Sequence, residues 1–224
     1  MWRLYPGPIT AVLIACSTVT TITTKAAPTC SEVVDGRQQL RVRIVPGTMD
    51  PMVLARVRAE VDAIWNRYRI DVVWEPPRES DEQALPDLWV QFVDARTPSA
   101  RRERGLAIAW LPFDNGTPTH RIQVSKKAAA TILATTSWAG GRRALLHGPE
   151  RLRTDALGRI VGRALAHEIG HYLLASPRHA ERGLMQAVLH PRDLVSPGTS
   201  ILTLGHVDVK ALRAARMASC ERAR

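Results

Sequence analysis

Apolar and polar residues alternate in short stretches of the chain, which is the pattern of strands with one buried face. Residues 39–47 (QLRVRIVPG) show this alternation and stop at a Pro-Gly pair. Four further stretches have strand character, at residues 70–77, 88–94, 105–113 and 121–129. Polar, proline-rich or glycine-rich segments end these stretches, so each is expected to form its own strand.

Apolar residues at helical spacing predict three helices. The first follows Asp50-Pro51, a pair that suits a helix start. Its apolar residues are Val53, Val57, Val61, Ile64, Trp65 and Tyr68. The second helix is expected to begin with Thr154 or Asp155 as its cap, and the third covers residues 205–220.

The order of these elements predicts one α+β domain over residues 30–224, whereas residues 1–29 have a different composition. There the uncharged run ITAVLIACSTVTTITT follows a start with a single arginine. The run is too short and too rich in threonine to span a membrane. It is typical of a secretory signal peptide, with cleavage after Ala26. The letters LIAC, ending at Cys16, also resemble a bacterial lipobox, which would make a lipidated Cys16 the first mature residue.

Both alternatives predict an exported protein, secreted or periplasmic, with a lipidated Cys16 as the one expected attachment to a membrane. Export permits disulfides. With Cys16 assigned to the signal segment, Cys30 and Cys220 remain near the two ends of the mature chain, and chain ends often lie close together. We therefore predict a Cys30–Cys220 disulfide, worth roughly 4 kcal/mol in the chain-entropy model. Two free thiols are the alternative.

The distribution of charge along the chain argues against nucleic-acid binding. The formal net charge is +10, but the arginines are spread along the chain. A nucleic-acid protein would show a dense basic stripe or basic residues interleaved with aromatic ones. We therefore expect a solvated basic surface and no nucleic-acid partner.

The strongest chemical pattern is HEIGH, at residues 167–171 within the second predicted helix. His167 and His171 lie four residues apart, so their imidazoles project one turn apart from one helix face and can share a metal ion. Zinc favours imidazole nitrogens in tetrahedral geometry. Glu168 lies just beside the metal position, where it can take a proton from a zinc-acidified water and pass it to a leaving amine.

A catalytic zinc usually has three protein ligands and a water. His179 is the nearest candidate for the third ligand, eight residues after His171. Ser176-Pro177 ends the helix and lets the chain turn back. Other candidates stay open, namely Glu181, His190, Asp193 and His206.

HEIGH, His179 and the following Gly183-Leu184-Met185 resemble the metzincin clan of zinc peptidases. That clan has the pattern HExxHxxGxxH followed by a Met-turn, and the chain is most similar to matrixin-like and archaemetzincin-like bacterial proteins. The resemblance implies a zincin-like fold. It has a twisted, mixed five-stranded sheet with an antiparallel edge strand above the cleft, an active-site helix and a C-terminal helix.

The same resemblance implies roles for individual residues. One zinc ion per chain would be bound by His167, His171 and His179, with Glu168 as general base and Met185 in the Met-turn. The edge strand would pair with an extended peptide substrate. Its substrate-binding residues would be Leu106, Ala107, Ile108, Ala109 and Trp110.

Two positions depart from the clan pattern. Leu174 stands where the clan has glycine, and Pro177 stands at the usual place of the third ligand. Either the turn is two residues longer and His179 binds the metal, or another residue is the third ligand. A glutamate such as Glu181 would place the chain with the gluzincins instead.

We therefore expect an exported, monomeric zinc endopeptidase whose partner is a peptide or protein substrate. The alternative is a zinc-stabilised binding or structural module of the same fold with little turnover. Glu168 favours the peptidase, because a structural zinc site needs no base and prefers four protein ligands.

Overall fold

The computed structural model describes residues 33–34, 36–45, 49–76, 87–94, 107–136 and 147–221. The predicted signal segment, with Cys16 and Cys30, lies outside these residues, as does the side chain of Cys220. The disulfide and both signal-segment alternatives therefore stay predictions. Within the described part of the chain, no helix is both long and apolar enough to cross a membrane.

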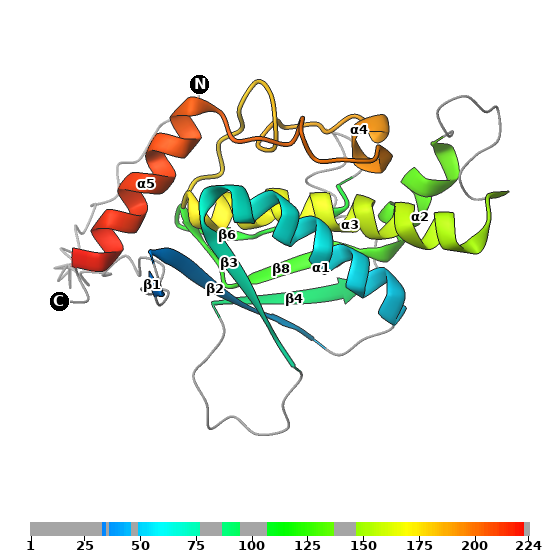
Figure 1. Cartoon of the computed structure of the whole chain (residues 1–224), viewed down its shortest axis with the longest axis horizontal. Helices are drawn as coiled ribbons and strands as arrows, with labels where there is room; N and C mark the ends of the chain where they lie inside the picture. Colours follow the sequence, from blue (N-terminus) through cyan, green and yellow to red (C-terminus); the bar gives the residue numbers. More distant parts are fainter. Residues whose placement is uncertain are drawn as a thin grey trace, which may run out of the picture.

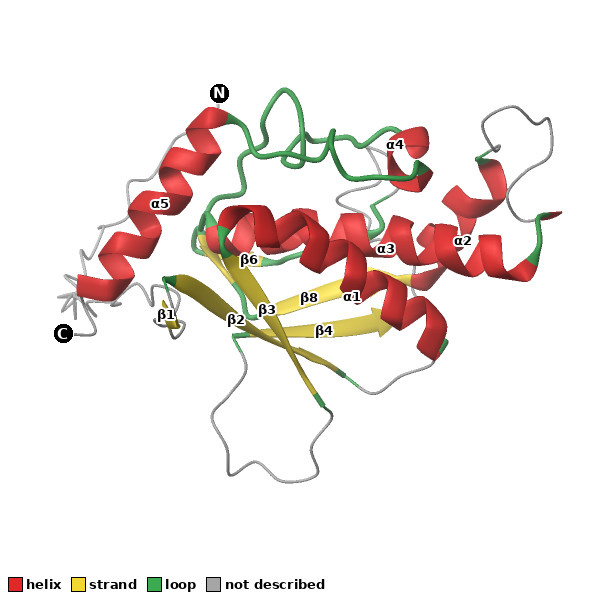
Figure 2. Cartoon of the chain, viewed as in Figure 1, coloured by secondary structure: helices red, strands yellow, loops and turns green. Residues whose placement is uncertain are grey.

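The described strands form a mixed sheet and a separate small hairpin (Figures 1 and 2). They are β1 (Val33–Val34), β2 (Arg37–Ile44), β3 (Ile70–Glu75), β4 (Leu88–Val93), β5 (Ala109–Trp110), β6 (Phe113–Asp114), β7 (Thr117–Pro118) and β8 (Arg121–Ser125). Four parallel strands lie in the order β3–β2–β4–β8, and β5 pairs antiparallel with β8 at the edge. The predicted α+β class and mixed sheet are confirmed, with the short β1, antiparallel to β2, as an additional strand.

The described helices are α1 (Pro51–Trp65), η1 (Asn66–Tyr68), α2 (Lys126–Thr135), α3 (Glu150–Leu173), α4 (Pro191–Val195) and α5 (His206–Glu221). Two of them, α1 and α3, cover one face of the sheet (Figure 1). Two glycines of α3 let these helices approach closely. A Cβ at Gly158 would lie 2.4 Å from the Cβ of Arg56, and one at Gly162 would lie 2.7 Å from the Cβ of Glu60. Helix α3 therefore packs closely beside α1, and both helices contact the sheet.

Helix α1 begins as the sequence predicts. The side chain of Asp50 accepts hydrogen bonds from the backbone N–H groups of Met52 and Val53, at 2.7 and 3.3 Å. These bonds satisfy two donors that a helix start leaves without partners. Val57 and Ile64 on the inner face of α1 are fully buried in the core.

The prediction of a strand over residues 121–129 is wrong for the second half of that range. The chain leaves the sheet at Ser125, whose Oγ accepts a hydrogen bond from the N–H of Ala128 at 3.1 Å. This cap starts α2, so the alanines after Lys127 are helical. The apolar run was compatible with either state, and a side-chain cap decided between them.

The start of α3 also differs from the prediction. The helix begins at Glu150, so neither Thr154 nor Asp155 caps it. Asp155 instead pairs with Arg159 at 2.6 Å and with Arg56 of α1 at 3.2 Å. The carboxylate that suggested a cap therefore holds two helices together.

The predicted strand at residues 105–113 is shorter in the structure. Only Ala109–Trp110 pairs with β8, and residues 105–106 lie outside the described part of the chain. After Leu111 the chain enters the β6–β7 hairpin, which turns at Asn115 and Gly116 with φ of 47° and 79°. Positive φ at both positions suits a tight hairpin turn.

Candidate metal centre and cleft

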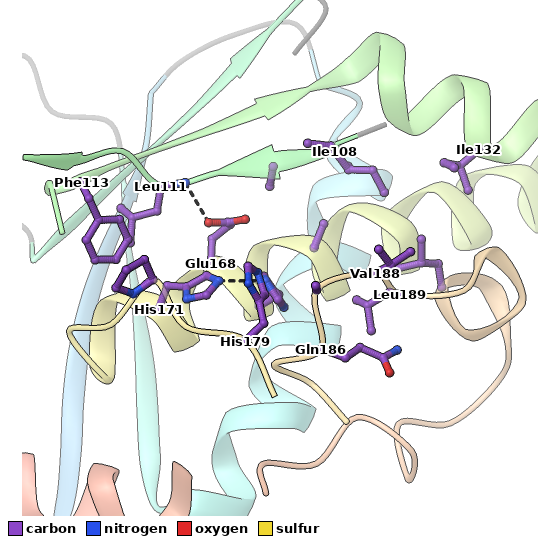
Figure 3. A pocket seen from close by; sticks show the side chains of 17 residues that line it. Ile108, Leu111, Phe113, Ile132, Glu168, His171, His179, Gln186, Val188 and Leu189 are labelled. Atoms are coloured by element: carbon purple, nitrogen blue, oxygen red, sulfur yellow. Dashed lines mark hydrogen bonds between the residues drawn. The ribbon is translucent and has the colours of Figure 1, made fainter. Parts of the chain in front are cut away.

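Three histidines meet at one point of the structure, as Figure 3 shows for His171 and His179. His167 and His171 come from the buried face of α3, and their Nε2 atoms lie 3.0 Å apart. His179 comes from the loop after the helix, and its side chain is exposed. The possible ligand atoms of all three lie within 4.8 Å of one another.

Backbone carbonyls orient the two helix histidines. Nδ1 of His167 lies 2.7 Å from the carbonyl oxygen of Leu184, and Nδ1 of His171 lies 2.7 Å from that of Ser176. A carbonyl oxygen only accepts hydrogen bonds, so each Nδ1 carries the proton and donates it. The Nε2 lone pairs then face the space that the three rings share, as metal-binding histidines require.

The end of α3 explains how the chain turns back toward the metal centre. The N–H of Ser176 donates to the carbonyl of His171, and the N–H of Ala175 donates to that of Tyr172, both at 3.1 Å. These two bonds form a Schellman motif, in which the residue after the cap adopts positive φ. That residue is Ala175, with φ of 46°. The metzincin pattern has glycine at the position of Leu174. In this chain the residue with positive φ is the next one, Ala175.

The turn brings His179 against both helix histidines. Its ring stacks on that of His167 at a centroid distance of 5.4 Å, and meets that of His171 edge-on at 4.8 Å. Of the candidates for a third ligand, the structure therefore brings His179 into the histidine group. The other candidates (Glu181, His190, Asp193 and His206) do not belong to that group.

Glu168 lies between the histidine helix and the sheet edge (Figure 3). Its carboxylate is buried, and Oε2 accepts a hydrogen bond from the backbone N–H of Leu111 at 2.8 Å. A bond from a fixed backbone donor holds the carboxylate in one orientation. Sequence reasoning missed this contact, because the N–H belongs to a residue just beyond β5.

The turn Gly183–Met185 packs under the helix. A Cβ at Gly170 would lie 2.4 Å from the Sδ of Met185, so the glycine of HEIGH leaves the space that the methionine occupies. Met185 is 1% exposed. Its carbonyl accepts from the N–H of Ala180 at 2.8 Å, which ties the turn to the residue after His179.

The cleft beside the histidines has a volume of about 450 Å³. Of the predicted substrate-binding residues, Ala107, Ile108 and Ala109 line it, Trp110 is buried and does not, and Leu106 lies outside the described part of the chain. Further apolar lining comes from residues that the sequence analysis did not assign to the cleft. These residues are Leu111, Phe113, Ile132, Val188, Leu189 and Leu194.

Phe113 is one of these missed residues, and its ring is nearly perpendicular to that of His171, at a centroid distance of 6.4 Å. Ile132 and Leu194 lie on α2 and α4. Neither short helix was predicted, since α2 was read in part as strand and α4 has five residues. The signals that could have found them were Ser125 as the cap of α2 and Pro191 at the first position of α4.

Comparisons with known proteins add little to this geometry. The chain matches no family model, and no curated protein is similar to it in sequence. One solved structure similar to it is archaemetzincin from Methanopyrus kandleri, at 11% sequence identity and a TM-score of 0.47. The match covers 82% of this chain and 98% of that chain. A likeness of this degree carries no conclusion about activity, so we base function on the site itself.

Proposed function

We propose that the chain is a zinc-dependent endopeptidase of the metzincin type. The observation that supports this proposal is the close group of His167, His171 and His179 beside the buried Glu168, on the wall of a cleft. Three protein ligands with a base next to them suit a catalytic zinc site better than a structural one, which usually has four protein ligands.

The residues present fit zinc by their chemistry. Imidazole is a preferred zinc ligand, and the hydrogen bonds on Nδ1 of His167 and His171 leave Nε2 as the donor atom. When bound, zinc would supply Lewis acidity toward a substrate carbonyl and make a water more acidic. We propose one ion per chain, held by these two residues and His179.

Glu168 would move the proton. Its carboxylate lies beside the histidines, and the N–H of Leu111 fixes its position. In the proposed reaction it accepts a proton from the attacking water and gives it to the amine that leaves when the peptide bond breaks. General acid–base groups of this kind contribute typically about 10²- to 10⁴-fold to the rate.

The sheet edge would hold the substrate. Strand β5 pairs with β8 on one side and contributes Ala109, with Ala107 and Ile108 just before it, to the cleft. An extended peptide can add to such an edge through its backbone. Because the deeper lining is apolar, we propose that an apolar side chain of the substrate enters there. Export as a secreted or periplasmic protein is proposed on the pattern of residues 1–29 alone.

A peptide library tests the proposed activity. Zinc-loaded wild type is incubated with a mixed peptide library, and new amino termini are identified by mass spectrometry. We expect cleavage that a chelator abolishes and added zinc restores. Glu168→Gln keeps the size of the side chain and its contact with Leu111 but loses the base. It should bind zinc normally and cleave roughly 10²- to 10⁴-fold more slowly.

Two results would contradict the proposed peptidase mechanism. Cleavage by Glu168→Gln at the wild-type rate would show that another group is the base. Zinc-loaded wild type that cleaves nothing in the library would favour the alternative of a zinc-stabilised binding module. Arg151→Met, at an exposed position of the first turn of α3, serves as a control for handling and purity.

A further inference from the structure

Arg163 is a fully buried arginine one helical turn before His167. Its guanidinium uses its donors in two directions. Nε donates to Oε2 of Glu60 on α1 at 3.0 Å. The two terminal nitrogens donate to the segment after the Met-turn, where they bind the carbonyl oxygens of Asp193, Ser196 and Gly198.

We call residues 186–198 the wall segment, because Val188, Leu189 and Leu194 of this segment line the cleft (Figure 3 labels the first two). Most of the segment is irregular, with α4 as its one short helix in the described chain. Arg159, one turn before Arg163, donates to the carbonyl of Val195 at 3.0 Å. Two arginines of the metal-binding helix therefore hold the backbone of the cleft wall.

Burying an arginine costs free energy, because the charged guanidinium loses its contacts with water. Burial lowers the pKa of Arg163, and the neighbouring carboxylate of Glu60 partly offsets this effect. A buried ion pair can often be replaced by apolar side chains without loss of stability. What the guanidinium adds is a rigid, planar set of donors, which fixes several carbonyl groups in one geometry.

We propose that Arg163 is a positioning residue for substrate selection. Arg163 binds one carbonyl within α4, that of Asp193, and two just after it. These bonds would set the position of Leu194, and hence the depth of the apolar part of the cleft. Peptides with a bulky apolar side chain next to the cleaved bond would be the substrates that depend on it. This inference rests on the proposed function, since it concerns the same cleft.

Two metal-directed probes separate the wall from the metal centre. Acetohydroxamate is small and reaches only the zinc, whereas a hydroxamate with a leucine-like side chain also reaches the apolar wall. Their affinities for zinc-loaded protein are compared in wild type and Arg163→Met. We expect the affinity for the larger probe to fall roughly tenfold, as for an impaired apolar pocket, with the affinity for acetohydroxamate unchanged. Arg163→Lys, which restores the charge and part of the donors, should recover part of the loss.

Further variants keep the test decisive if Arg163→Met fails to fold. Arg159→Met removes the bond to Val195 together with the ion pair to Asp155, and should show the same change to a smaller degree. The double variant Glu60→Leu, Arg163→Met removes the buried pair together and should keep the selective loss. Arg151→Met, exposed on the same helix, should leave both affinities unchanged.

The outcomes are distinct. An unchanged ratio of the two affinities in both Arg163→Met and Arg159→Met would overturn the role of these arginines. An equal loss for both probes would also overturn it, because Arg163 would then act on the metal centre. Wild type that binds neither probe, despite added zinc, would instead overturn the metal site and with it the proposed peptidase.

Discussion

The candidate metal centre has two halves that are built in different ways. In the helix half, His167 and His171 are buried on α3, and carbonyl groups orient both rings. In the loop half, His179 is exposed and owes its place to a turn and to the bond from Ala180 to Met185. Helical periodicity fixes the first half, whereas backbone conformation at a few positions fixes the second. Substitutions in the helix half should therefore change the zinc affinity, whereas substitutions in the turns of the loop half should change the free energy of unfolding.

The largest expected effect lies in the helix half. His171→Ala removes a proposed ligand whose ring is held in place before any metal binds. We expect zinc affinity to fall roughly 10³-fold, a few kcal/mol of the binding free energy of such sites. Competition with a chromogenic chelator measures the affinity. His206→Ala, at the exposed start of α5, is the control. Equal affinity in the two variants would show that the helix half does not bind zinc.

The next effect concerns the turn beneath the site. Gly183 has φ of 80°, and a Cβ there would lie 2.1 Å from the carbonyl oxygen of Thr203. Gly183→Ala should lower the free energy of unfolding by about 3 kcal/mol or more, through strain and a backbone clash. Urea denaturation measures it.

Gly116 provides a matched control for that clash. It has φ of 79° but nothing within 4 Å of an added Cβ. Gly116→Ala should therefore lose only the conformational part, about 1 kcal/mol. If the two variants lost equal stability, the close packing of the turn against Thr203 would be disproved.

A smaller and opposite effect is expected at the turn that leads to His179. Ala175 adopts φ of 46°, a conformation that glycine adopts without strain. Ala175→Gly should raise the free energy of unfolding by about 0.5–1 kcal/mol, after the added entropy of the unfolded chain is subtracted. Ala187→Gly, at a position without positive φ, should not stabilise. A destabilised Ala175→Gly variant would argue against the described Schellman turn.

The smallest effect lies far from both halves, in the acid stability of the sheet. A hydrogen bond from Arg37, with Nε 2.7 Å from Asp71, lowers the pKa of this partly exposed carboxyl. A lowered folded-state pKa adds stability above the ordinary value near 3.8, and this stability is lost as the pH falls through the folded pKa. Urea midpoints of Asp71→Asn and wild type should therefore differ above pH 4 and converge below it. A constant difference at every pH would contradict the linkage.

The sequence predicted the parts of the fold that depend on periodicity. The alternation in β2, the capped start of α1 and the HEIGH face of α3 all follow from local pattern, and the structure has each of them. Element ends and short helices were predicted less well, because Ser125 and His190 decide them by single hydrogen bonds. Long-range contacts were out of reach. Nothing in the sequence near Leu111 or Arg163 indicates that one would bind Glu168 and the other the cleft wall.

The central claim is that the loop half completes the site, and zinc content tests it most directly. Purified wild type and His179→Ala are loaded with zinc, dialysed against a weak chelator and measured by elemental analysis. We predict one zinc per chain in wild type and a large loss in the variant. One zinc per chain in both proteins would contradict the account, since His179 would then not be a ligand.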